Sequence, residues 1–305
     1  MKILVTGANG LVGSALRKYS PENTIFVTRE DADLRDFGAT LALFERHRPT
    51  HVIHTAAEVG GIGGNMARPG EYFLDNLLIN ANVLEVARRA DVEKVLSFLS
   101  TCIFPNNASF PLNESSLHDG PPHPSNAAYA YAKRMIDVQS RAYRAQWGCN
   151  FITAVGTNIY GPHDNFSIAE GHVLPALIHK CFIAAQEGNE FPIWGSGKAL
   201  REFVLSDDIA KLALWAIAEY EEPDPIIFTS GVETSIKELV ELVAGAMDFT
   251  GPIVFDASKP DGQLRKPSDT TKLRHYLPDF TFTPVPKGVR ETVAWFKEAY
   301  PDVRM

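Results

Sequence analysis

A glycine-rich turn directly after the first apolar run constrains the fold of this chain more than any other feature. The N-terminal sequence KILVTGANGLVGSAL places Gly7, Gly10 and Gly13 between a predicted strand and a predicted helix. In dinucleotide-binding βαβ units the first glycine permits a tight turn, the second lets the backbone approach a pyrophosphate, and the third lets the helix pack on the strand. The start of the helix also favours the phosphate charge. The pattern therefore predicts a Rossmann-type fold that binds a dinucleotide.

Short apolar runs and helical patterns alternate through the first half of the chain. The runs are KILVT, TIFVT, HVIH, KVLSFL and FITAVG, and the helical stretches include DNLLINANVLEVARRA. This alternation is typical of βαβ units, whose strands form a parallel sheet with helices on both faces. We predict an α/β fold with a doubly wound Rossmann-type domain over residues 1–160. The looser pattern that follows, with turn-rich pieces such as WGSGKALREF, predicts mainly a smaller α/β substrate lobe over residues 161–305, with some chain crossing back.

Composition narrows the class of protein. The net charge of −8 and a pI of about 5.6 argue against binding to nucleic acid or to an anionic membrane surface. No apolar stretch reaches the ~18 residues of a membrane span, and the N-terminal sequence lacks the pattern of a signal peptide. The three cysteines lack metal-type spacing, so we predict reduced thiols, a cytoplasmic location and no metal site.

The end of the second predicted strand bears on which dinucleotide binds. TIFVT is followed by Arg29, Glu30 and Asp31. An arginine can pair with the 2′-phosphate of NADP(H), whereas a carboxylate accepts a hydrogen bond from the ribose of NAD(H) and repels that phosphate. Because Arg29 comes first, we predict NADP(H); the alternative is that Arg29 is a solvated surface residue. Asp33, next to Leu34, is a candidate for contact with the adenine.

A tyrosine and a lysine with helical spacing indicate the chemistry. AAYAYAKRM places Tyr129 and Lys133 four residues apart, on one face of a helix, with Tyr131 off that face. The lysine ammonium is expected to lower the pKa of the tyrosine from its usual ~10. Such a tyrosine can exchange a proton with a carbonyl or alcohol while hydride moves at the same carbon. The motif gains weight because Ser100 and Thr101 follow a predicted strand 29 residues upstream of the tyrosine.

The stretch LSTCIFP leaves two interpretations for Cys102. A cysteine just past a strand is most often a small buried hydrophobic residue. The same thiol, however, follows the strand-end hydroxyls at the edge of the sheet where ligands bind, so it can also be a reactive group.

Several motifs together resemble the GDP-L-fucose synthase family, the GDP-4-keto-6-deoxy-D-mannose epimerase/reductases of the extended short-chain dehydrogenase superfamily. They are TGANGLVG, LSTCIFP, YAYAK, GPHDNF, GHVLPALI, WGSG and FDASKPDGQLRK. The resemblance runs from the N-terminus to about Phe296. The cysteine motif, GPHDNF and the histidine motif are typical of a much smaller group than the superfamily. Two positions depart from the bacterial pattern. Asn9 replaces an arginine that can help to hold the 2′-phosphate, and Lys180 replaces an arginine and so offers a point charge instead of a bidentate fork.

The resemblance implies an NADPH-binding Rossmann-type domain, a C-terminal nucleotide-sugar lobe and a homodimer. It also implies two steps at one site: epimerisation at C3 and C5 of the 4-keto sugar, then hydride delivery to C4. Ser100, Tyr129 and Lys133 match the residues that serve reduction in the family, and Cys102 and His172 match those that serve epimerisation. A thiol and an imidazole both have reference pKa values within ~2 units of neutrality, so either can be the base or the acid.

The substrate must present a diphosphate and a guanine, and phosphate oxygens favour charged donors. We predict that three cations bind the diphosphate: Lys180, Arg201 and Lys266. Trp194 is a candidate for contact with the sugar, and Asn158 and Asn165 are candidates for polar contacts. The alternative is that these residues occupy ordinary surface or core positions.

The glycine-rich segment AAEVGGIGGN follows the predicted strand HVIH. Its glycines allow the backbone to approach the nicotinamide and the sugar closely; the alternative is a flexible loop. With this segment the predicted cofactor site is complete, and it consists of Gly7, Asn9, Gly10, Leu11, Val12, Gly13, Arg29, Asp33, Leu34, Ala56, Ala57, Tyr129 and Lys133.

Three other functions compete with an NADPH-dependent epimerase/reductase. A nucleotide-sugar dehydratase on the same fold needs an Asp-Glu pair after the strand-end hydroxyl, where this chain has Cys102 and Ile103. A simple 4-epimerase has no use for Cys102 and His172 as a pair. A protein that only senses the nucleotide is disfavoured because Ser100, Tyr129 and Lys133 are all present.

Overall fold

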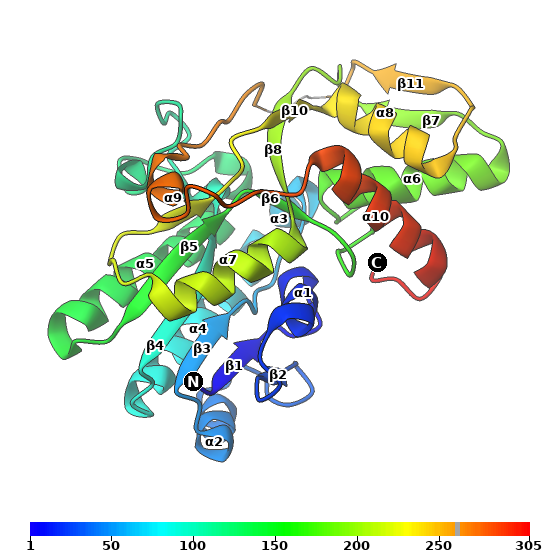
Figure 1. Cartoon of the computed structure of the whole chain (residues 1–305). Helices are drawn as coiled ribbons and strands as arrows, with labels where there is room; N and C mark the ends of the chain where they lie inside the picture. Colours follow the sequence, from blue (N-terminus) through cyan, green and yellow to red (C-terminus); the bar gives the residue numbers. More distant parts are fainter. Residues whose placement is uncertain (260–262) are drawn as a thin grey trace.

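A six-stranded parallel sheet forms the centre of the larger part of the computed structural model, which describes residues 1–259 and 263–305 (Figure 1). The strand order is β2-β1-β3-β4-β5-β9, and each adjacent pair is parallel. The strands are β1 (Ile3–Thr6), β2 (Ile25–Val27), β3 (His51–His54), β4 (Lys94–Ser100), β5 (Phe151–Gly156) and β9 (Ile226–Phe228). Apolar residues run almost without interruption through β4 and β5 because both faces of these strands are buried.

Helices cover both faces of this sheet. Leu4 and Val52 point to a core shared with α2, α4 and α5, whereas Val5 and Ile53 pack with α1 and α7 on the other face. These helices are α1 (Leu11–Tyr19), α2 (Phe37–His47), α4 (Pro69–Arg89), α5 (Ala127–Trp147) and α7 (Ser206–Glu219). The predicted doubly wound parallel sheet is therefore confirmed. The strand order reverses between β1 and β3, which is where such sheets bind ligands.

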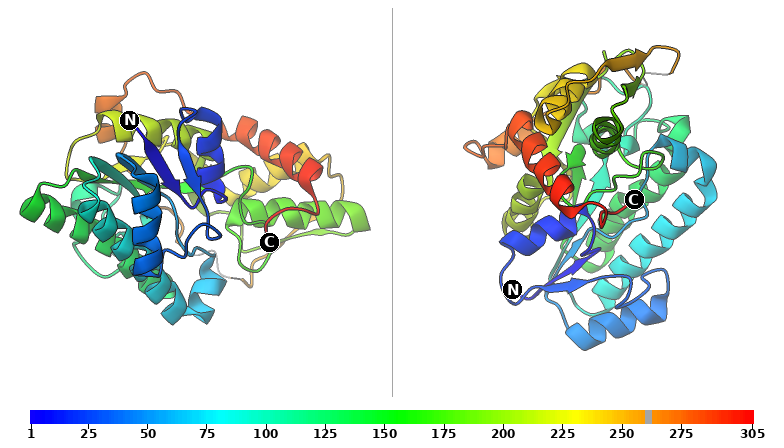
Figure 2. Two further views of the ribbon diagram at one scale, coloured as in Figure 1. Left: turned by 90° about the horizontal axis from the view of Figure 1, so that it is seen from below. Right: turned by 90° about the vertical axis from the view of Figure 1, so that its right-hand side faces the viewer.

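A smaller lobe lies beside the sheet, next to the C-terminus (Figure 2). It contains the three-stranded sheet β10-β8-β6, the two-stranded parallel sheet β11-β7 and three helices around a separate apolar core. Its elements are β6 (Asn158–Tyr160), α6 (Val173–Glu187), β7 (Phe191–Trp194), β8 (Leu200–Leu205), β10 (Glu233–Ser235), α8 (Ile236–Met247), β11 (Ile253–Asp256) and α10 (Val285–Ala299). Helix α8 starts with a capping box between Ser235 and Glu238, which satisfies two amides at its first turn.

The second half of the chain also contributes to the large sheet. Strand β9 is its last strand, α7 covers one face, and Leu273 of α9 (Thr271–Tyr276) packs in the same core. The other short elements are α3 (Ile62–Ala67) and the 3₁₀ helices Thr101–Ile103, Glu114–Ser116 and Pro124–Asn126. Within residues 1–259 and 263–305, no helix is both long and apolar enough to cross a bilayer.

Candidate active site

A cavity of about 1170 Å³ lies between the carboxyl ends of the large sheet and the smaller lobe. Its lining comes from the segments after β1, β3, β4 and β5, from α5, and from β7, β8 and α6. Pockets for a single drug-sized ligand have about 300–1000 Å³, so this cavity is larger than such a ligand needs. The structure brings together all the predicted site residues in this lining except Gly13.

The turn between β1 and α1 fits the phosphates of a dinucleotide. Gly7 has a left-handed backbone (φ +70°), and a Cβ there would lie 2.8 Å from the backbone of Ala56. Helix α1 starts at Leu11 with Gly10 as its cap and without a side-chain hydrogen bond, so its first amides are available to an anion. A Cβ on Gly13 would lie 2.4 Å from the carbonyl oxygen of Gly7, so this close packing of the helix behind the turn requires glycine.

Two arginines that follow β2 differ in how closely carboxylates hold their side chains. The Arg29 side chain is 68% exposed and lies 3.7 Å from the Glu58 carboxylate. Arg35 is held by Asp33 at 2.7 Å and by Asp75 at 3.1 Å. The hydrogen bond from Arg35 lowers the pKa of Asp33 to about 2. Arg29, which lines the cavity, is therefore the arginine available to a 2′-phosphate.

Tyr129 and Lys133 lie on the face of α5 that meets the end of β4. Nζ of Lys133 donates to the carbonyl of Phe98 at 3.1 Å, and burial lowers the pKa of this lysine to about 8. The pKa of Tyr129 is raised well above its usual value, first by burial and then by the charges of Cys102 and Tyr72. The expectation that Lys133 lowers the pKa of Tyr129 is wrong for this structure, because burial dominates and the ammonium is bound to a strand carbonyl.

Ser100 and Cys102 are joined at the start of the 3₁₀ turn that ends β4. The amide of Cys102 donates to Oγ of Ser100 at 3.5 Å, a long hydrogen bond that caps the turn. Burial raises the pKa of the Cys102 thiol, and the hydrogen bond to Ser100 and the charge of Lys266 oppose that rise.

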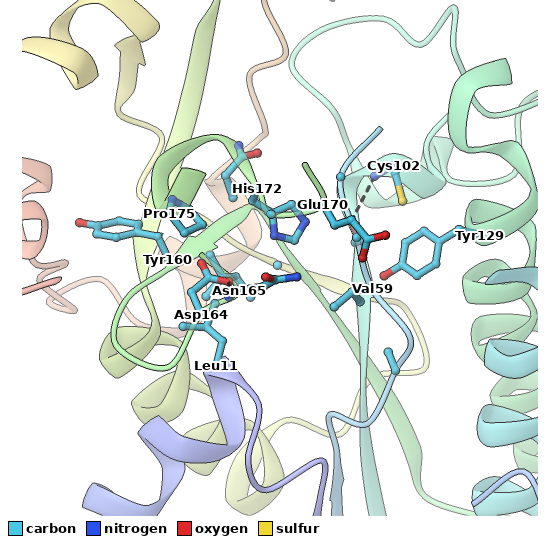
Figure 3. A pocket seen from close by; sticks show the side chains of 18 of the residues that line it. Leu11, Val59, Cys102, Tyr129, Tyr160, Asp164, Asn165, Glu170, His172 and Pro175 are labelled. Atoms are coloured by element: carbon cyan, nitrogen blue, oxygen red, sulfur yellow. Dashed lines mark hydrogen bonds between the residues drawn. The ribbon is translucent and has the colours of Figure 1, made fainter. Parts of the chain in front are cut away.

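His172 is the residue before α6 and approaches the cavity from the smaller lobe. Figure 3 shows His172 and Asn165 on one side of the cavity and Cys102 and Tyr129 on the other. Burial, and then the charge of Arg304, lowers the pKa of His172. A thiol and an imidazole, two groups that can take or give a proton, therefore face the same space from different walls.

The three predicted cations line the same cavity from different elements. Nζ of Lys180 lies 4.5 Å from the centre of the Trp194 ring, and Nζ of Lys266 donates to the carbonyl of Thr101 at 2.8 Å. Arg201 donates to the carbonyl of Leu200, the residue before it. Burial lowers the pKa of each of these cations. An anionic ligand is favoured here, since it restores part of the lost solvation.

Comparisons with known proteins agree with this geometry. The model of the NAD dependent epimerase/dehydratase family matches residues 3–231. A protein named GDP-L-fucose synthase from Dictyostelium discoideum is 45% identical over 99% of this chain and 97% of its own length. The protein of the same name from Escherichia coli (strain K12) is 34% identical over 97% of both chains. The crystal structure of a GDP-L-fucose synthetase from Naegleria fowleri bound to NADP superposes with a TM-score of 0.95 at 43% identity, over 99% of this chain and 94% of that one.

The chain belongs to the GDP-L-fucose synthase family. The resemblance predicted from the motifs is confirmed by these matches, which extend over nearly the whole chain. The 45% identity to the protein from Dictyostelium discoideum includes both the sheet and the smaller lobe, because the alignment covers 99% of the chain.

The predicted sugar contact and the two predicted polar contacts of this family member differ in their surroundings. Trp194 is 63% exposed and stacks under Lys180, so the alternative that it packs in the core is wrong. The Asn158 amide donates to the carbonyl of Glu202 at 2.7 Å, and Oδ1 of Asn165 accepts from the amide of Ser167 at 3.0 Å. Both amides therefore also fix the backbone around the cavity.

The glycine-rich segment after β3 is not a loop throughout, because α3 begins at Ile62. A Cβ on Gly60 would lie 2.2 Å from the Tyr72 hydroxyl, and one on Gly61 would lie 2.9 Å from the carbonyl of Gly171. The amide of Gly61 donates to the carbonyl of Glu170 at 2.7 Å. Gly60 thus permits close contact with Tyr72 of α4, and Gly61 permits close contact with the residues that precede His172.

Sequence reasoning missed several residues of the lining. Asp164 is 5% exposed, its Oδ2 lacks a hydrogen-bond partner among the described residues, and burial raises its pKa to about 7. Arg304 reaches the cavity because the carbonyl of its backbone accepts from the amide of Phe166 at 2.8 Å. Asp164 stands in the motif GPHDNF, which gave a signal, whereas nothing local in the sequence around Arg304 points to a site.

Proposed function

We propose that this chain converts GDP-4-keto-6-deoxy-D-mannose to GDP-L-fucose by 3,5-epimerisation and subsequent NADPH-dependent reduction at C4. The observation that carries this proposal is the presence of both sets of groups in one cavity. Ser100, Tyr129 and Lys133 line it together with Cys102 and His172. The near-full-length identity to proteins named GDP-L-fucose synthase supports the same substrate.

The first step exchanges protons on the carbons beside the ketone. Tyr129 and Ser100 donate hydrogen bonds to the C4 oxygen, which makes the protons at C3 and C5 acidic because the enolate charge is stabilised. Cys102 and His172 take a proton from one face of the ring and return one to the other. The electron pair stays on the enolate between these two transfers, so no redox change occurs in this step.

The second step reduces the C4 ketone. The turn at Gly7 and Gly10 would hold the pyrophosphate of NADPH and Arg29 would pair with its 2′-phosphate, and the bound cofactor would supply the hydride. Tyr129 gives its proton to the C4 oxygen as the alcohol forms, and its raised pKa means that it enters the step protonated. Lys133 lies one helical turn from Tyr129, and its positive charge favours the anion that develops when the tyrosine gives up its proton.

The GDP portion lies toward the smaller lobe. Lys180, Arg201 and Lys266 hold the diphosphate, Trp194 offers an exposed aromatic face, and Asn158 and Asn165 orient the sugar. We do not favour a dehydratase, because Cys102 and Ile103 occupy the positions where that reaction needs carboxylates.

We also propose that the protein is a cytoplasmic homodimer. Exposed apolar side chains form stripes on two adjacent helices, α4 and α5, which pack against each other. A second copy of this chain can cover them in an isologous interface. The stripes consist of Leu74 and Leu78 on α4 and Tyr131, Met135 and Val138 on α5. The three cysteines are free, as a reducing compartment favours.

The test is to incubate the purified protein with GDP-4-keto-6-deoxy-D-mannose and follow NADPH absorbance. NADPH oxidation with formation of GDP-L-fucose supports the proposal. No oxidation by a folded protein that binds NADPH would overturn it. Cys102→Ser is expected to slow product formation while direct reduction of the unepimerised ketone continues, which separates the two steps.

A further inference from the structure

Lys266 approaches Cys102 from a part of the chain that is remote in sequence. Its Nζ donates to the carbonyl of Thr101, the residue directly before the cysteine, at 2.8 Å. The charge of Lys266 favours the thiolate of Cys102, and the thiolate in turn favours the charged form of Lys266. The ammonium has two further N–H groups, which leaves it able to bind a second acceptor in the cavity.

The backbone around Lys266 is fixed by both parts of the molecule. The amide of Leu112 donates to the carbonyl of Pro267, and the amide of Asp269 donates to the carbonyl of Leu112, each at 2.8 Å. The amide of Ser268 donates to Oε1 of Glu202 at 3.0 Å, and Glu202 is 2% exposed in β8. The lysine is therefore held in place before any ligand binds.

The other ionisable groups that face Cys102 come from α5. They are Lys133, Arg134 and Tyr129. Lys133 is bound to the carbonyl of Phe98, and Nε of Arg134 donates to the carbonyl of Ile103 at 2.6 Å. Of the cations near the thiol, Lys266 acts on it more strongly than Lys133. The charged groups around this cysteine are thus cations, which favour its thiolate and oppose the rise in pKa that burial causes.

We propose that Lys266 is the positioning residue whose charge, held on the carbonyl of Thr101, favours the thiolate of Cys102, in addition to any contact it makes with the substrate diphosphate. The assignment to epimerisation rests on the proposed function. When the thiolate takes a proton from a substrate carbon, the proton ends on sulfur and the electron pair stays on the enolate. Lys266 touches neither the carbon nor that proton; it acts through the thiol beside it.

The test measures the thiol without substrate or cofactor, so its outcome does not depend on which reaction the protein catalyses. The rate of Cys102 alkylation by iodoacetamide is followed against pH, with peptide mass spectrometry to separate it from Cys149 and Cys181. Two variants remove the charge: Lys266→Gln, which can still donate a hydrogen bond, and Lys266→Met. In both, the pH profile of Cys102 alkylation is expected to shift to higher pH by about one unit. At a pH below the thiol pKa, Cys102 is then alkylated about tenfold more slowly than in the wild-type protein.

Two further variants separate charge from shape. Lys266→Arg keeps the positive charge and is expected to retain the wild-type profile. Lys259→Met removes an exposed lysine from the same region and is the matched control. The proposal is overturned if Lys266→Gln and Lys266→Met keep the wild-type profile, or if Lys266→Arg shifts as far as they do. A variant that unfolds is recognised by alkylation of Cys181, which is fully buried in the native protein.

Discussion

Gly13→Ala is the substitution whose effect follows most directly from the structure. The new Cβ would lie 2.4 Å from the carbonyl oxygen of Gly7, 2.7 Å from Cα of Ala8 and 2.9 Å from its carbonyl carbon. All three atoms belong to the backbone, so no side chain can turn away. Helix α1 must move away from the turn that carries Gly7 and Gly10, and this turn is the proposed phosphate site.

The size of the effect comes from overpacking. Forcing an extra carbon into a well-packed site costs about 1–3 kcal/mol of unfolding free energy. Because the displaced atoms form the phosphate turn, we expect part of this cost to appear in binding as well. A loss of about 1.4 kcal/mol weakens NADPH binding tenfold.

Gly245→Ala is the matched control for this substitution. Gly245 lies within α8, and a Cβ there would meet nothing within 4 Å. Because alanine is the better helix former, this variant is expected to gain about 0.5–1 kcal/mol of unfolding free energy and to keep its NADPH affinity.

The assays are urea unfolding, for the free energy of unfolding, and fluorescence titration with NADPH, for the dissociation constant. The reasoning predicts opposite signs of stability change for Gly13→Ala and Gly245→Ala. It would be refuted if Gly13→Ala matched the wild-type protein in both stability and NADPH affinity.

Three further predictions concern the cofactor, a buried carboxyl and the proposed dimer. Arg29→Ala is expected to weaken binding of NADPH about tenfold and that of NADH little, because only NADPH carries the 2′-phosphate; equal losses for both in calorimetric titrations would contradict this. Burial raises the pKa of Asp164 from 3.8 to about 7, so the folded state binds more protons between these values and wild-type stability falls as pH rises through that window. Asp164→Asn should therefore gain at least about 1 kcal/mol over wild type between pH 4 and pH 8 in urea unfolding, and a constant difference would rule this out. Leu78→Glu places a charge in the exposed stripe of α4 and α5 and should shift sedimentation from dimer to monomer; an unchanged dimer would place the interface elsewhere.

The large sheet could be predicted from the sequence because its signals are local. KILVT, HVIH and KVLSFL are apolar runs of strand length, and the glycines after the first run have one clear structural use. Strand β9 was not predicted as the sixth strand, because only three residues, Ile226–Phe228, complete the sheet and they come after the smaller lobe has begun. Its pairing with β5 depends on long-range contact rather than on periodicity.

The sequence predicted many residues that the fold brings to one cavity, but it did not predict their interactions or lining residues such as Asp164 and Arg304. The spacing of Tyr129 and Lys133 identified a helix face, yet burial dominates the pKa of both groups. Burial and the carbonyl of Phe98 are tertiary features that spacing does not reveal. The same holds for Lys266, which sequence alone placed at a diphosphate and which the fold also brings against Thr101.

The central claim is that one cavity performs both proton exchange and reduction. It is tested most directly by running the reaction in D₂O with unlabelled NADPH and locating deuterium in the product by NMR. The account predicts GDP-L-fucose with deuterium at C3 and C5 and protium at C4. A reduced product without deuterium at C3 and C5 would show that the ketone is reduced without epimerisation, and would contradict the roles proposed for Cys102 and His172.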